Sequence, residues 1–219
     1  MNTRSHDMEM VVAARQVEEV TKALFHTILL HRTTGKYEYS SRHSGTFSVG
    51  VVGMEDVDLS TLDFTYVRCT SRELDQWLSQ QIEGLPSSLC QPDSPKTGKI
   101  TLEFYERKKG RWLLPAENVS WEVWHLILSL TEPTSEEEWE ECQQCVAEKL
   151  ATTVQYITDV VNRPEYIPRN PTAENLPNVF DIRFPEVQPY LHRIVIGGAE
   201  ETVAGRMQKL IRNISGYQM

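Results

Sequence analysis

The sequence predicts a single domain of the mixed α+β class. Residues 100–105 and 121–130 are apolar runs in which side chains alternate between two faces, as they do in strands. Other stretches repeat apolar residues every three or four positions, which is typical of helices with one buried face. The 219 residues include no linker rich in proline, glycine and serine that would divide the chain. These three observations together indicate one α+β domain.

Composition and charge argue against several classes of protein. A formal net charge of −9 argues against nucleic-acid binding, which usually leaves a basic footprint. The one basic cluster (Arg107, Lys108, Lys109 and Arg111) is interpreted as a turn that stays in water. The polar N-terminus is followed by no signal-peptide core, and no run of about 18 apolar residues could span a membrane. We therefore expect a cytoplasmic protein without a transmembrane segment, whose four cysteines are reduced thiols.

Residues 8–82 are expected to hold four strands and two helices. Alternation and turn residues predict strands at 8–13, 37–39, 46–52 and 63–68. Apolar residues at helical spacing predict a first helix over 15–30, with Gly35 as its stop signal. Thr70 and Glu73 have the spacing of a capping box, which predicts a second helix from there to about Ile82, stopped by Gly84 and Pro86.

The C-terminal half is expected to contain the longest helix and then an irregular segment. Both faces of 121–130 are apolar, which indicates a central strand. Thr134 or Ser135 caps a helix that runs to about Asn162. Six prolines then fall between residues 163 and 190, a stretch expected to contain no helix and no central strand and to wrap the domain as a belt. A strand over 191–196 and an amphipathic helix over 202–214 complete the chain.

No catalytic or metal-binding constellation is predicted, so we expect a protein that is not an enzyme and needs no metal or cofactor. Cys142 and Cys145 have a C-x-x-C spacing, but a zinc site needs a second ligand pair and none matches. Both lie within a strongly periodic helix, where cysteine commonly acts as a small hydrophobe. The histidines lack partners for acid–base roles, and no glycine-rich phosphate loop precedes a helix.

Six segments resemble the autophagy-related protein 101 family and occur in that family's order along almost the whole chain. They are LLHRTTGK (29–36), DFTYVR (63–68), LEFYERKK with RW (102–112), WEVW (121–124), NRPEYIP (162–168) and VQPYL (187–191). The resemblance implies that residues 1–219 form a single HORMA domain. Such a domain has a central, mostly antiparallel β-sheet backed by three helices, a C-terminal safety belt at about 164–200 and a terminal helix.

The resemblance also implies a function. Family members are non-catalytic adaptors that pair with and stabilise the HORMA domain of autophagy-related protein 13 within the Unc-51-like kinase complex. That complex starts autophagosome formation, which implies a cytoplasmic protein that also occurs at the phagophore assembly site. The alternative is a HORMA switch of the spindle-checkpoint or meiotic type, whose belt closes around a short peptide.

The resemblance identifies two candidate binding sites. The family carries an exposed finger with Trp-Pro-Phe that recruits downstream autophagy factors; here Arg111 and Trp112 match, and Leu113 and Leu114 replace Pro-Phe. Leucine keeps the apolar bulk and loses the aromatic stacking geometry. The alternative is that Trp112 folds back onto its own sheet. The HORMA-pairing face is expected at His31 and Arg32 with the exposed side of residues 136–149.

Overall fold

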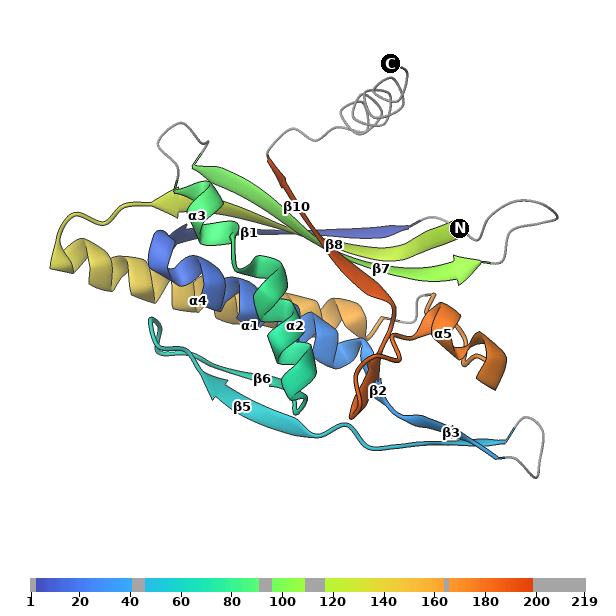
Figure 1. Cartoon of the computed structure of the whole chain (residues 1–219). Coiled ribbons are helices and arrows are strands. Elements are labelled where there is room, and N and C mark those ends of the chain that lie inside the picture. Colours follow the sequence, from blue (N-terminus) through green and yellow to red (C-terminus); the bar gives the residue numbers. More distant parts are fainter. Residues whose placement is uncertain (1–2, 41–45, 91–95, 109–116, 164–165, 199–219) are drawn as a thin grey trace, which may run out of the picture.

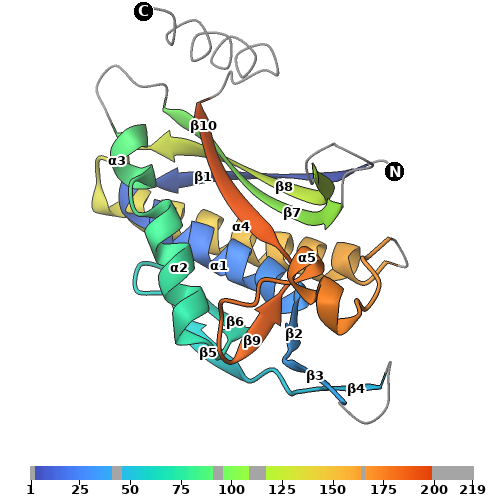
Figure 2. The same cartoon turned by 45° about the vertical axis from the view of Figure 1, so that its right-hand side comes forward.

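A computed structural model describes residues 3–40, 46–90, 96–108, 117–163 and 166–198. It has the mixed α+β architecture that the sequence predicts: a curved four-stranded sheet lies above a layer of helices, and shorter strands lie below that layer (Figure 1). The helices cover one face of the main sheet, and most of the apolar core lies between the two layers (Figure 2).

The main sheet has the strand order β1-β8-β7-β10. Its strands are β1 (Arg4–Ala13), β7 (Thr97–Lys108), β8 (Glu117–Thr131) and β10 (His192–Gly198). β8 pairs parallel to β1 and antiparallel to β7, and β7 pairs antiparallel to β10. The sheet is therefore largely antiparallel, and the prediction of a central strand over 121–130 is confirmed.

The helical layer consists of two long helices and two shorter ones. α1 (Val17–His31) follows a short 3-10 turn, η1 (Ala14–Gln16), and packs beside α4 (Glu136–Val161). α2 (Arg72–Ile82) and α3 (Leu85–Leu89) lie across α1 (Figure 2). α4 begins where it was predicted to begin, because the Ser135 hydroxyl accepts a hydrogen bond from the Glu138 amide at 3.1 Å.

Three sequence-based predictions in the N-terminal half are corrected. α1 ends at His31, and Gly35 lies instead in strand β2 (Thr33–Gly35). The cap of α2 is Ser71, whose hydroxyl accepts from the Leu74 amide, so the helix starts one residue after the predicted capping box. α2 ends at Ile82 as predicted, but Pro86 is not its stop signal: Pro86 lies in the first turn of α3, where no intrahelical partner is needed for the missing N–H.

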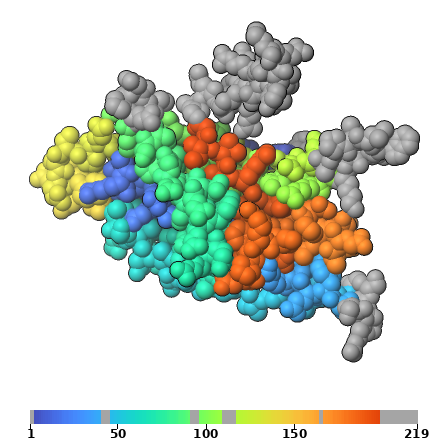
Figure 3. Space-filling model, viewed as in Figure 1, coloured from blue at the N-terminus to red at the C-terminus, as the bar shows by residue number. Residues whose placement is uncertain are grey.

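The belt, residues 164–200, is described from residue 166 to residue 198. It contains a 3-10 turn, η2 (Ala173–Asn175), helix α5 (Leu176–Val179), strand β9 (Val187–Pro189) and β10. The prediction that the belt holds no helix is wrong for one turn, since Pro177 fits the start of α5. β9 pairs with β2, and β10 is an edge strand of the main sheet, so no belt strand is central. On the face in Figure 3 the belt packs beside α2 and the β2–β3 segment.

Two buried histidines predict a stability that depends on pH. His192 Nδ1–H donates a hydrogen bond to the Tyr190 carbonyl at 2.7 Å, and the His192 ring packs edge-on against Trp77. Its pKa and the pKa of His26 are lowered by burial. A histidine whose folded pKa lies below its unfolded value of about 6.5 stabilises the fold above that pH, and this stability is lost as the pH falls.

We therefore expect the free energy of unfolding to be level above about pH 7 and to decrease below about pH 6.5, by at most about 1.4 kcal/mol per pH unit for each histidine. Denaturant titrations across this range measure the slope. His192→Phe, which keeps a ring of similar size, should reduce the slope. An unchanged slope in this variant would show that His192 does not contribute.

Candidate protein-interaction surface

An extended stretch, residues 47–58, forms the lower rim of the molecule (Figure 1). We call it the rim strand. It comprises β4 (Phe47–Val49), residues 50–53 and β5 (Met54–Asp58). On its inner side β4 pairs with β3 (Tyr37–Tyr39), and β5 pairs with β6 (Thr65–Cys69). Among the described residues, no strand pairs with its outer side. β5 was not predicted from the sequence.

The rim strand exposes large apolar side chains in succession. Val51 is 91% exposed and Met54 is 67% exposed. Val49 and Phe47 are 44% and 37% exposed, and Val67 on β6 lies directly across from Asp56 and is 39% exposed. Single exposed apolar residues are common on any protein, but several within one short stretch indicate a candidate binding surface. The rim is therefore the strongest candidate site in the described part of the chain.

The rim is held in place by the belt. Tyr39 donates a hydrogen bond to the Pro171 carbonyl at 2.7 Å, and Tyr37 donates one to Asn170 Oδ1 at 2.9 Å. Gln188, on β9, accepts a hydrogen bond from the Tyr37 amide at 2.6 Å. The Tyr37 ring also contacts Phe47, at 5.3 Å between centroids. These contacts fix the position of β3 and β4, so the apolar surface is built on a supported strand pair.

A close backbone contact joins the rim to β2, and it gives a prediction. A Cβ on Gly35 would lie 1.9 Å from the Gly50 carbonyl oxygen, far inside van der Waals contact. We expect Gly35→Ala to force the two backbones apart and to lower the free energy of unfolding by about 1–3 kcal/mol, the usual range for overpacking. Chemical denaturation measures the change. Gly84→Ala is the control, since a Cβ there meets nothing within 4 Å; equal effects of both substitutions would contradict the prediction.

The two residues predicted for a pairing face differ in exposure. Arg32 is 2% exposed, and its Nε and Nη2 donate to the two carboxylate oxygens of Glu122 at 2.5 and 2.8 Å. Its guanidinium is therefore committed to the interior and unavailable to a partner. His31 is partly buried, and its pKa is lowered by burial and by the charge of Arg32. Of the predicted pair, only His31 reaches the surface.

Glu122 is the centre of a buried ionic cluster. Besides Arg32, it contacts Arg4 Nη2 at 3.3 Å and is itself fully buried. Both guanidinium groups lie 5.8 Å from the centre of the Trp121 ring, within range of a cation–π interaction. The Arg32 carbonyl also accepts a hydrogen bond from the Tyr190 amide at 2.9 Å. The cluster thus links the main sheet, the end of α1 and the belt.

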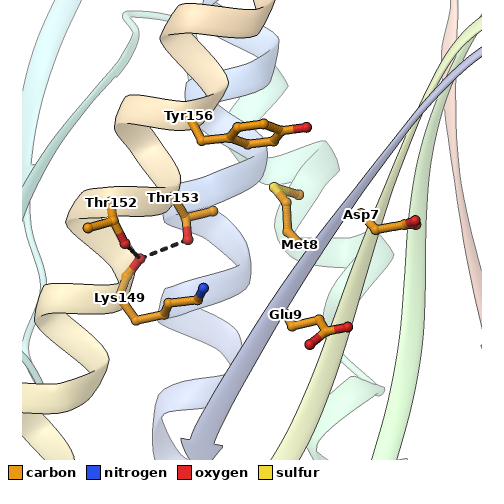
Figure 4. A pocket seen from close by; sticks show the side chains of 7 residues that line it. All are labelled: Asp7, Met8, Glu9, Lys149, Thr152, Thr153 and Tyr156. Carbon is orange, nitrogen blue, oxygen red and sulfur yellow. Dashed lines mark hydrogen bonds between the residues drawn. The ribbon is translucent and has the colours of Figure 1, made fainter.

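Two grooves flank α4 and neither has the arrangement of an active site. One, of about 360 Å³, lies between α4 and β1 (Figure 4). Its Thr152 and Thr153 hydroxyls both donate to the Lys149 carbonyl, and Asp7 and Glu9 point to the side of β1 away from α4. The other, of about 370 Å³, is lined by Asp63, Gln143, Gln144, Ala147 and Glu148, on the side of α4 predicted to pair.

The other predicted features are placed as follows. The finger residues Arg111, Trp112, Leu113 and Leu114 lie outside the described residues, as does the helix predicted over 202–214. Cys142 Sγ contacts Gln16 Oε1 at 3.8 Å, and Cys145 is exposed. The described part of the chain holds no group of three or more histidine, cysteine or acidic side chains arranged for a metal ion. Within the same residues, no helix combines the length and apolarity needed to cross a bilayer.

Comparison with known proteins identifies the family. A family model described as Autophagy-related protein 101 matches residues 9–174. The proteins of that name from Xenopus tropicalis and Homo sapiens are each 40% identical to this chain over 216 residues, which covers 97% of this chain and 98% of theirs. The Arabidopsis thaliana protein of that name is 27% identical over 128 residues, or 58% of this chain and 52% of its own. The chain therefore belongs to the autophagy-related protein 101 family.

Proposed function

We propose that this protein is a non-catalytic adaptor in autophagy that pairs with the HORMA domain of autophagy-related protein 13 and joins the Unc-51-like kinase complex. The observation that carries the proposal is the rim strand, a supported strand that exposes four large apolar residues, Phe47, Val49, Val51 and Met54. Membership of the family supports the link to autophagy. The adaptor acts in the cytoplasm and at the phagophore assembly site.

The pairing face, in this proposal, consists of the rim strand with neighbouring His31 and the exposed side of α4 up to Lys149. His31 ends α1 directly before β2, and β2 contacts the rim where Gly35 meets Gly50. The face thus combines an apolar centre with the polar margins of α4, as protein interfaces commonly do.

The proposed domain is a single HORMA domain over residues 1–219 with the belt in an open arrangement. β10 occupies one edge of the main sheet, and β1 is paired with β8 along its whole length of ten residues at the other edge. The hydrogen bonds from Tyr37 and Tyr39 to the belt add to its attachment. This arrangement favours a fixed adaptor over a switch whose belt closes around a peptide. Two separable conformers, or a captured peptide, would favour the switch.

Co-expression with the HORMA domain of autophagy-related protein 13 tests the proposed function. The two chains should elute from size-exclusion chromatography as one complex of one copy each, as light scattering would measure. A full-length chain that remains a stable monomer in the presence of that domain would contradict the proposal.

The finger is proposed to recruit downstream autophagy factors through Trp112 and Leu114. We expect Trp112→Ala combined with Leu114→Ala to leave folding and HORMA pairing unchanged while autophagic flux in cells decreases, because an exposed anchor contributes to binding and little to folding. Thermal unfolding and co-purification are the controls. A loss of about 2–5 kcal/mol of stability would show instead that these residues belong to the core.

A further inference from the structure

We propose that the outer edge of the rim strand binds an extended segment of another protein by strand addition, and that this segment has apolar residues in one half and basic residues in the other. The inference rests on the proposed function, because both take the rim strand as a protein-binding surface. It adds the mode of binding and the chemistry of the bound segment.

The backbone of the rim strand has one satisfied side and one open side. On the inner side, the Gly50 amide donates to the Lys36 carbonyl at 2.8 Å, and the Gly53 carbonyl accepts from the Thr70 amide at 2.8 Å. In extended chains the polar groups of successive residues point to opposite sides. Within each strand, the N–H and C=O groups of alternate residues therefore point outward. These residues are Phe47 and Val49 in β4, and Met54, Asp56 and Asp58 in β5.

The open edge consists of the outer edges of β4 and β5, joined by residues 50–53, and open strand edges are templates for another strand. Native proteins usually protect such edges with charged side chains, above all lysine, or with proline or a covering element. Residues 46–58 contain no lysine, arginine or proline. An extended segment that pairs here would satisfy the outward groups, as in other cases of recognition by strand addition.

The side chains along the edge define the chemistry of the bound segment. From Phe47 to Met54 the exposed side chains are apolar except for Ser48, and beyond them Asp56 and Asp58 are exposed acids. Thr65 donates a hydrogen bond to Asp58, and none of the ion pairs found among the described residues involves either acid. Side chains directly across a strand pair interact, and opposite charges there are favourable. The segment is therefore apolar opposite 47–54 and basic opposite 56–58.

A second copy of this chain does not fit the edge. Because residues 46–58 include no cation, an identical strand brings none to Asp56 or Asp58. Two copies would also each carry a net charge of −9, and this repulsion opposes association. The occupant is consequently a different chain.

Synthetic peptides provide the test. The probe is a labelled peptide of about twelve residues, enough to pair with residues 47–58, with alternating Val and Thr in one half and alternating Lys and Thr in the other. A peptide with the reversed sequence covers the opposite strand direction, and matched peptides carry Glu in place of Lys. Fluorescence anisotropy with the full-length chain should show binding of one Lys peptide and at least roughly tenfold weaker binding of its Glu counterpart.

Two substitutions at one position separate backbone pairing from side-chain contact. Asp56→Ala removes the carboxylate and keeps the outward amide, whereas Asp56→Pro removes both. We expect the proline variant to bind the Lys peptide roughly tenfold more weakly than the alanine variant, the effect of about one lost hydrogen bond. Equal affinities of the two variants, or no binding of either Lys peptide to the wild type, would overturn the inference.

A second measurement uses only the wild-type chain, so its result does not depend on whether the proline variant folds. Residue-resolved hydrogen exchange of the wild-type chain should slow at Met54, Asp56 and Asp58 when the Lys peptide is added, while the inward amides at 55 and 57 change little. Uniform or absent protection would overturn the inference. If the peptides fail and the complex with autophagy-related protein 13 still forms, the inference fails and the proposed function stands; loss of that complex alone counts against the proposed function.

Discussion

Replacing Glu122 with alanine is expected to lower the free energy of unfolding by about 3–5 kcal/mol. The carboxylate is fully buried and is held by Arg32 through two hydrogen bonds, with Arg4 close by. Its removal leaves the buried Arg32 guanidinium without a counter-charge. The cost of desolvating this guanidinium is then no longer compensated. Urea titration of the wild type and the variant measures the difference.

The matched control is an ion pair at the surface. Lys96 and Glu132 lie 3.0 Å apart, but their side chains are 64% and 74% exposed. Glu132→Ala should change the stability by less than about 0.5 kcal/mol, since exposed pairs contribute little. If Glu122→Ala is no more destabilising than Glu132→Ala, the buried cluster does not stabilise the junction of the sheet, α1 and the belt.

Replacing Val51 and Met54 together with aspartate is expected to weaken binding to the HORMA domain of autophagy-related protein 13 by roughly 100-fold or more. Each carboxylate would have to be desolvated opposite an apolar partner surface, at a cost of several kcal/mol. In the unbound protein both side chains are largely exposed, so stability should change by less than about 0.5 kcal/mol for each substitution. Isothermal titration calorimetry and thermal unfolding measure the two quantities.

Val11→Asp controls for the added charge. Val11 is 61% exposed, but it lies on β1 in the main sheet, on the far side of the helical layer from the rim (Figure 1). This variant should bind the HORMA domain as the wild type does. Comparable losses in Val11→Asp and in the rim variant would show that net charge, and not the rim, controls pairing.

Elements defined by local signals could be predicted from the sequence. α4 was predicted from Ser135 and the regular spacing of Val146, Leu150 and Ile157, and the structure buries these three. β8 was predicted as central because both of its faces are apolar. The end of α1 could not be found in this way: β2 exists because it pairs with β9, about 150 residues further along the chain, and no local pattern reports that pairing.

The candidate site was predicted only in part. Phe47, Val49 and Val51 were assigned to a strand, but apolar alternation normally indicates a buried face, and here that face is exposed. Ser48 and Gly50, which alternate with these residues, give the opposite face of the strand little apolar surface to bury. This is a sequence signal for an exposed strand. Arg32 looked like a surface residue at a helix end. Its partner Glu122 is 90 residues away, so the burial of this pair had no sequence signal.

Hydrogen exchange of the full-length chain, alone and bound to the HORMA domain of autophagy-related protein 13, tests most directly whether the rim strand is the pairing surface. We predict that exchange slows across residues 47–58 in the complex and is unchanged across the outer face of β1. A complex that forms with protection elsewhere and none across residues 47–58 would show that the rim strand is not the pairing surface.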